Sequence, residues 1–105
     1  MLEILEYELT QADIDYKRFG IGKKNSGFFL PSSPPNKKPF PFDLETGRDS
    51  IKTTIRQSTY RIGKGLKPWF RAHRELEVGD KVVFKTIEKL KEYRLLAPKE
   101  IKEVV

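Results

Sequence analysis

Short runs of β-branched and aromatic residues, each bounded by glycine, proline or another turn residue, constrain the fold of this chain more than any other feature. In Asp49–Gln57, for example, Ile51, Thr53 and Ile55 alternate with polar residues, which is the pattern of a half-buried strand. The runs that predict strands are 2–9, 28–30, 40–45, 49–57, 58–62, 81–87 and 93–97, with the tail 101–105 as a further edge strand. About seven short strands separated by turns are typical of a small β-barrel or closed sandwich.

Two short helices and one loop interrupt these strands. Thr10 lies three residues before Asp13, a spacing that predicts a helix N-cap and a helix ending near Lys17. Pro68 suits the first turn of a helix over 67–76. The proline-rich segment 31–39 cannot donate a full set of ladder hydrogen bonds, so we expect a loop there.

The size of the chain indicates one domain spanning residues 1–105. Because there is no cysteine, disulfides and zinc–thiolate sites are excluded, and a reducing compartment is favoured. No apolar run approaches the ~18–20 residues that span a bilayer. We therefore expect a cytoplasmic protein with no membrane partner.

Charge is distributed unevenly along the sequence. Residues 1–16 carry five acids and no base, residues 17–74 carry fourteen Lys or Arg against three acids, and residues 75–105 carry seven of each. A basic middle between acidic and neutral flanks is typical of a surface that faces a polyanion. A lysine-rich surface with no such role remains the alternative.

Sites for catalysis, cofactors or metals are not indicated. His73 is the only histidine, and without a second histidine or a cysteine it is not expected to hold a metal. The segment 20–24 lacks the spacing of a phosphate-binding loop for nucleoside triphosphates. We expect Asp13 and Asp15 to serve a helix N-terminus, and Glu100-Ile101-Lys102 to be a chance match to a nuclease signature. No cofactor is expected, and an enzyme is disfavoured.

Most aromatic residues lie in apolar runs, so we expect them in the core. These are Phe28, Phe29, Phe40, Phe42, Trp69, Phe70, Phe84 and Tyr93. Tyr16, Phe19 and Tyr60 are flanked by basic or polar residues and are the candidates for platforms on which bases could stack.

In order and spacing, several motifs together match one known family. They are Thr10-Gln11-Ala12-Asp13-Ile14, a basic loop, Gly27-Phe28-Phe29-Leu30-Pro31, a basic strand pair, Trp69-Phe70, Leu76-Glu77-Val78-Gly79-Asp80 and Val82-Val83-Phe84. The chain resembles a B3-type DNA-binding pseudobarrel domain. It is more similar to the prokaryotic members, the effector-binding or target-recognition domains of restriction endonucleases, than to plant transcription factors.

The resemblance implies a mainly β fold, a seven-stranded open pseudobarrel with two short helices, that places two arms in the major groove of double-stranded DNA. Carried over by position, the N-terminal arm is Lys17–Ser26 and the C-terminal arm is Arg56–Lys64. The predicted DNA-binding residues are Lys17, Arg18, Lys23, Lys24, Asn25, Ser26, Arg56, Gln57, Ser58, Thr59, Tyr60, Arg61 and Lys64. The sequence departs from restriction enzymes in having shorter loops and no nuclease domain, so a nuclease would be a separate domain or subunit.

The residue types of these arms support the same chemistry. Lysine and arginine neutralise phosphates, and arginine can bind guanine O6 and N7 with two hydrogen bonds. Gln57 and Asn25 could do the same for adenine, and Ser26, Ser58 and Thr59 could contact phosphate or base edges. Two other interpretations stay open at this point. One is a barrel that binds RNA or single strands, and the other is a protein-interaction barrel.

Overall fold

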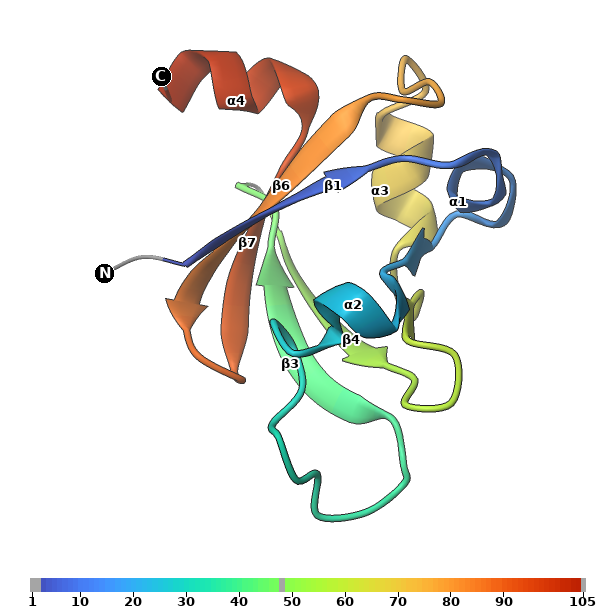
Figure 1. The fold of residues 1–105 in the computed structure, drawn as a ribbon. Helices are drawn as coiled ribbons and strands as arrows, with labels where there is room; N and C mark the ends of the chain where they lie inside the picture. Colours follow the sequence, from blue (N-terminus) through green and yellow to red (C-terminus); the bar gives the residue numbers. More distant parts are fainter. Residues whose placement is uncertain (1–2, 48, 105) are drawn as a thin grey trace.

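The computed structural model describes residues 3–47 and 49–104, which form a mainly β fold with one seven-stranded sheet and four short helices (Figure 1). The strands are β1 Ile4–Glu8, β2 Phe19–Gly20, β3 Phe40–Glu45, β4 Ser50–Ile55, β5 Arg61–Ile62, β6 Lys81–Glu88 and β7 Glu92–Leu96. The helices are α1 Gln11–Tyr16, α2 Gly22–Ser26, α3 Lys67–Ala72 and α4 Pro98–Val104. None of the described helices is long and apolar enough to cross a membrane.

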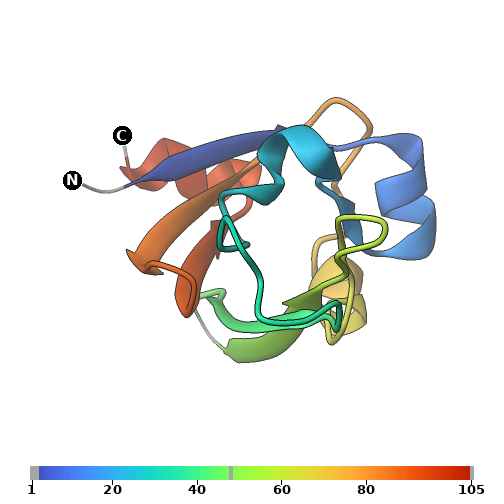
Figure 2. The same ribbon diagram turned by 60° about the horizontal axis from the view of Figure 1, so that its bottom comes forward.

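The sheet runs in the order β1-β6-β7-β3-β4-β5-β2 and curls into an open half-barrel (Figure 2). All neighbours are antiparallel except β3 and β7, which are parallel. The two edge strands, β1 and β2, are consecutive in the chain and are joined by α1. The short connection requires the two edges to lie near each other, and this is what curls the sheet.

One buried carboxylate ties the two edges together. Asp13, in α1, is fully buried and accepts hydrogen bonds from the Tyr7 hydroxyl of β1 at 2.5 Å and the Gly20 amide of β2 at 2.9 Å. It also accepts from the amide of Thr10 at 3.0 Å, while the Thr10 hydroxyl accepts from the Asp13 amide. The predicted N-cap is therefore confirmed, and the same carboxylate links β1, α1 and β2.

The aromatic core predicted from the apolar runs is confirmed. Phe29, Phe42, Trp69, Phe70, Phe84 and Tyr93 are buried, and Phe28 and Phe40 are half-buried against them. The prediction for Phe19 as a stacking platform is wrong. Its side chain is 0% exposed, with its ring centroid 5.2 Å from that of Phe70 and 5.3 Å from that of Phe84.

Most of the predicted strands are confirmed, including 40–45, 49–57 and the hairpin of 81–87 with 93–97. The strand predicted at 28–30 is wrong. That segment forms turns in which the amides of Phe29 and Leu30 both donate to the Ser26 carbonyl. Three apolar residues are too few to establish a period, and here they direct Phe29 into the core.

The predicted helix count and the predicted tail strand are also corrected. Two helices were expected, and the described residues contain four, since the basic segment after β2 includes α2. The tail forms α4 rather than an edge strand. The amides of Glu100 and Ile101 donate to the Ala97 carbonyl, and the Ala97 amide donates to the Glu100 carboxylate. Helix α3 ends at Ala72, earlier than the predicted 76.

Candidate nucleic-acid interface

The two predicted arms lie side by side. In the ladder of β2 with β5, Gly20 is the partner of Arg61 and Phe19 is the partner of Ile62. The amide of Gly22 donates to the Tyr60 carbonyl at 3.3 Å, just beyond the end of this ladder. The chain therefore brings the N-terminal basic segment and the C-terminal basic turn to the same edge of the sheet.

A tight turn forms the tip of the C-terminal arm. The Arg56 amide donates to the Arg61 carbonyl at 2.9 Å, and the Tyr60 amide donates to the Arg56 carbonyl at 2.7 Å. Tyr60 adopts a φ of 55°, which reverses the chain between β4 and β5. These bonds fix the backbone at Arg56 and Arg61, so the two exposed arginines project from anchored positions.

Arg18 lies at the base of the N-terminal arm and is held by Asp13. Its Nη1 is 3.0 Å from the Asp13 Oδ1, and its side chain is only 15% exposed. Two glycines make room for it. A Cβ at Gly63 would lie 3.2 Å from the Arg18 Cβ, and one at Gly20 would lie 2.6 Å from its Nη1. Arg18 is thus built into the fold, with part of its charge compensated.

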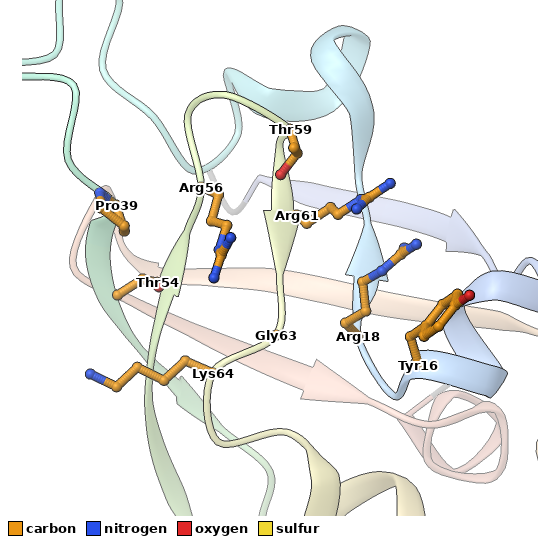
Figure 3. Close-up of a pocket in the computed structure, with 9 residues that line it drawn as sticks. All are labelled: Tyr16, Arg18, Pro39, Thr54, Arg56, Thr59, Arg61, Gly63 and Lys64. Atoms are coloured by element: carbon orange, nitrogen blue, oxygen red, sulfur yellow. The ribbon is translucent and has the colours of Figure 1, made fainter.

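These elements enclose an open groove of about 810 Å³ (Figure 3). Its described lining residues are Tyr16, Arg18, Pro39, Thr54, Arg56, Thr59, Arg61, Gly63 and Lys64. Four of them are cations, and none is acidic. Figure 3 shows the side chains of Arg18 and Arg61 next to each other, while Arg56 projects from the turn after β4 and Lys64 from the segment after β5. The groove therefore has a strongly positive lining.

Among the described residues, the groove cations other than Arg18 form no ion pair with an acid. Within the described part of the chain, the ion pairs join Arg18, Lys81, Lys89, Lys91 and Arg94 to carboxylates, and none of them includes Arg56, Arg61 or Lys64. Uncompensated cations in a concave surface concentrate positive potential there. Such a lining favours an anionic ligand.

A second hollow of about 470 Å³ lies between the end of α2, the proline-rich loop and the turn after β4. It is lined by Ser26, Gly27, Leu30, Pro31, Ser32, Pro34, Gln57 and Tyr60. The side-chain amide of Gln57 does not point to free solvent. Its Nε2 donates to the carbonyls of Asn36 at 2.9 Å and Lys38 at 2.6 Å. Reading adenine with Gln57 would require those donors, so this geometry does not present Gln57 as a base reader.

The other predicted contact residues are not among the described residues that line the groove. Lys23 and Lys24 are exposed on α2, and Lys17 occupies the left-handed C-cap of α1 with a φ of 54°. The Ser26 hydroxyl donates to the Lys23 carbonyl. Asn25 makes a long 3.5 Å bond from its Nδ2 to the Ile21 carbonyl, and Ser58 is exposed in the arm turn. The groove itself brings together Arg18, Arg56, Thr59, Arg61 and Lys64.

Four groove residues were not among the predicted contacts. They are Tyr16, Pro39, Thr54 and Gly63. The sequence carried a signal for Thr54, because the alternation of the predicted strand 49–57 places it on the same face as Lys52 and Arg56. Tyr16 had been named as a possible stacking platform, and it is 70% exposed with the Arg18 guanidinium 5.7 Å from its ring centroid. Pro39 and Gly63 carried no signal in the sequence.

The remaining chemistry-bearing residues have structural roles. No cluster of His, Cys, Asp or Glu in the described residues could hold a metal ion. The His73 ring stacks on Trp69, and its Nδ1 lies 2.8 Å from the Trp69 carbonyl. Burial, together with the hydrogen bond to the Asp13 carboxylate, raises the pKa of Tyr7 well above its usual range. Tyr7 therefore stays a hydrogen-bond donor rather than an acid–base group.

Comparison with known proteins identifies a protein with a similar fold but does not assign the chain to a family. No family model and no curated protein matches the chain. Among solved structures, the chain is similar to the N-terminal domain of Helicobacter pylori LlaJI.R1, with a TM-score of 0.64 and 18% identity. The match covers 90% of this chain and 87% of that one. At this identity the likeness shows a shared fold.

Proposed function

We propose that this protein binds double-stranded DNA in a sequence-specific manner, as a B3-like recognition domain, through the groove and the two arms that frame it. The observation that carries the proposal is the convergence of Arg18, Arg56, Arg61 and Lys64 in one open groove whose described lining holds no acid. Phosphates supply most of the affinity of such surfaces, and arginines at groove edges supply base discrimination.

The arrangement also supports particular roles for the arginines. Arg56 and Arg61 are exposed, have no described carboxylate partner and stand on a hydrogen-bonded turn, so they are suited to base edges. Arg18 is tied to Asp13 and is suited to a phosphate at the base of the groove. Lys23 and Lys24, exposed on α2, are suited to the flanking backbone.

The structural neighbour is consistent with this proposal. LlaJI.R1 carries the designation of a restriction-system component, and its N-terminal domain shares the fold. By analogy, the present chain would act as a recognition module without catalysis of its own, and cleavage would belong to another domain or subunit.

One observation favours a second candidate, binding of single-stranded nucleic acid. Tyr16 is 70% exposed at the rim of the groove, beside a guanidinium, and could stack on a base. The buried Phe19 removes one of the three platforms this alternative requires, and Tyr60 is only partly exposed, packed against the core.

Selection of bound duplexes from a random pool, at a stated salt concentration, tests the proposal. The selected duplex and its single strands are then compared by fluorescence anisotropy, with Tyr16→Ala as the variant that separates the two candidates. We expect an enriched sequence, duplex affinity above single-strand affinity, and little effect of Tyr16→Ala. Preference for the single strand, lost in Tyr16→Ala, would replace the proposal with its alternative.

A further inference from the structure

The proline-rich loop 31–39 lies against the C-terminal arm and belongs to neither predicted arm. In Figure 1 it projects from the end of the half-barrel where the turn between β4 and β5 also projects, and Figure 2 shows both segments on the side turned forward. Pro39 lines the groove, and Pro34 lines the second hollow together with Gln57 and Tyr60. The loop therefore borders both concave surfaces.

The Gln57 side chain fixes this loop to the arm. One amide nitrogen donates to two carbonyls, those of Asn36 at 2.9 Å and Lys38 at 2.6 Å, across 21 and 19 positions of the chain. Within the loop, the Lys38 amide donates to the Asn36 side-chain oxygen at 2.9 Å. The prolines lower the conformational freedom of the segment further. The loop is thus fastened to the arm at Asn36 and Lys38.

The loop carries charge at its held end. Lys37 and Lys38 are exposed, the loop sequence contains no acid, and neither lysine takes part in an ion pair with any carboxylate of the described residues. The free energy of holding two uncompensated cations beside a positive groove is unfavourable, because like charges repel. A polyanion that covers both the loop and the groove removes that repulsion.

We propose that loop 31–39 is a third contact of the DNA-binding surface, in which Lys37 and Lys38 meet the phosphate backbone, and that Gln57 is a positioning residue for it rather than a base reader. The inference rests on the proposed function and adds a surface to it. It also assigns a function to the two hydrogen bonds that the Gln57 amide donates to the loop.

Duplex affinity measured across a range of salt concentrations tests the lysines. In the variant with Lys37→Ala and Lys38→Ala, the log–log salt slope should become shallower by about 1–2 units, since each phosphate contact contributes about 0.9. The sequence preference should not change. Lys91→Ala, which removes a cation from the turn between β6 and β7, is the control and should leave the slope unaltered.

Gln57→Met tests positioning, because methionine has a similar size and no donor. Without DNA, trypsin should cleave after Lys37 several-fold faster in Gln57→Met than in the parent chain, while cleavage after Lys91 keeps its rate. With DNA, Gln57→Met should weaken binding in the parent chain but have little further effect when Lys37 and Lys38 are already alanine. Coupling of this kind is the signature of action through the loop.

The outcomes separate the two levels of the proposal. If the parent chain binds no duplex, the proposed function fails and the third contact fails with it. If the parent binds and the lysine variant keeps the full slope, only the third contact is overturned. If Gln57→Met changes the preferred base and its effect adds fully to that of the lysine variant, Gln57 is a reader and the positioning role is overturned.

Discussion

Two regions of the molecule are rich in cations, and they differ in how those cations are compensated. On β6, β7 and the turn between them, Lys81, Lys89, Lys91 and Arg94 each lie 2.7–3.6 Å from a glutamate. In the groove, Arg56, Arg61 and Lys64 form no ion pair with any carboxylate that the structure describes. The same residue types are therefore largely paired with acids in one place and unpaired, among the described residues, in the other.

The topology explains the difference. The acidic first strand, β1, pairs with β6, so that Glu6 reaches Lys81, and Glu3 reaches Lys89 in the adjoining turn. The acids at the start of the chain are thus used to neutralise cations near its end. The acids of β3 lie beside β4, with Asp43 opposite Lys52, and none of the described ion pairs joins them to Arg56, Arg61 or Lys64. A net charge of +6 understates how positive the groove region is, and local pairing is the better guide to a binding surface.

The largest expected effect concerns Asp13, which compensates the one paired cation in the groove. Asp13→Ala leaves Arg18 and three other donors without their acceptor, and breaking a buried ion pair costs about 3–5 kcal/mol. Urea denaturation should show this loss in the free energy of unfolding. Asp15→Ala, on the same helix but exposed, is the control and should change it little. If Asp13→Ala lowers the free energy of unfolding by less than about 1 kcal/mol, the carboxylate does not hold the two sheet edges together.

Arg61→Ala is expected to have the next largest effect, this time on binding. Loss of the proposed two-bond contact to guanine should cost about 1–3 kcal/mol and relax the sequence preference at one position. The matched variant is Arg94→Ala, which removes an arginine already paired with Glu45. Fluorescence anisotropy titrations with the selected duplex measure the affinity of both variants. Equal losses of affinity in the two variants would mean that paired and unpaired arginines contribute alike to binding.

Gly79→Val should change stability without changing specificity. Gly79 has a φ of 93° in the turn before β6, a conformation that costs a β-branched residue about 1–3 kcal/mol. An added Cβ meets no atom within 4 Å, so strain of the backbone is the whole effect. Gly27→Ala is the control, since Gly27 has a φ of −63° and equally open surroundings. A variant Tm equal to that of the parent chain would contradict the assigned strain.

The smallest expected effect is that of Lys23→Ala combined with Lys24→Ala. These exposed lysines stand on α2, whose first residue, Gly22, is hydrogen-bonded to Tyr60 of the C-terminal arm. Their loss should flatten the salt slope by about 1–2 units and weaken all duplexes alike. Titrations of a selected and a scrambled duplex at several salt concentrations give both quantities. An unchanged salt slope would mean that α2 does not contact DNA. A changed sequence preference would mean that these lysines contact bases rather than phosphates.

Local patterns predicted the parts of this fold that depend on local physics. The alternation of Ile51, Thr53 and Ile55 gave β4 its inward face, and the spacing of Thr10 and Asp13 gave the N-cap of α1. The tail was misread although Pro98 and Glu100 carry helix-start signals, with the Glu100 side chain capping the Ala97 amide. Short apolar runs such as 28–30 lack the length that would distinguish a strand from a turn.

Features set by long-range contacts could not be predicted from the sequence. Phe19 follows two basic residues, so it was expected to be exposed, yet Arg18 is held by Asp13 and Phe19 points into the core. The hydrogen bonds from the Gln57 amide to a loop some 20 positions away had no signal in the sequence. The two arms were placed by position alone, and only the pairing of β2 with β5 shows that they share one edge.

The central claim, that the uncompensated groove rather than net charge binds DNA, is tested most directly by two charge-matched double variants. Arg56→Ala with Arg61→Ala removes two groove cations, and Lys81→Ala with Lys91→Ala removes two paired ones. On the selected duplex at physiological salt, the account predicts a loss of at least about 100-fold for the first variant, about 3 kcal/mol, and a loss below threefold for the second. Equal losses in the two variants would contradict the account, because binding would then follow total charge alone.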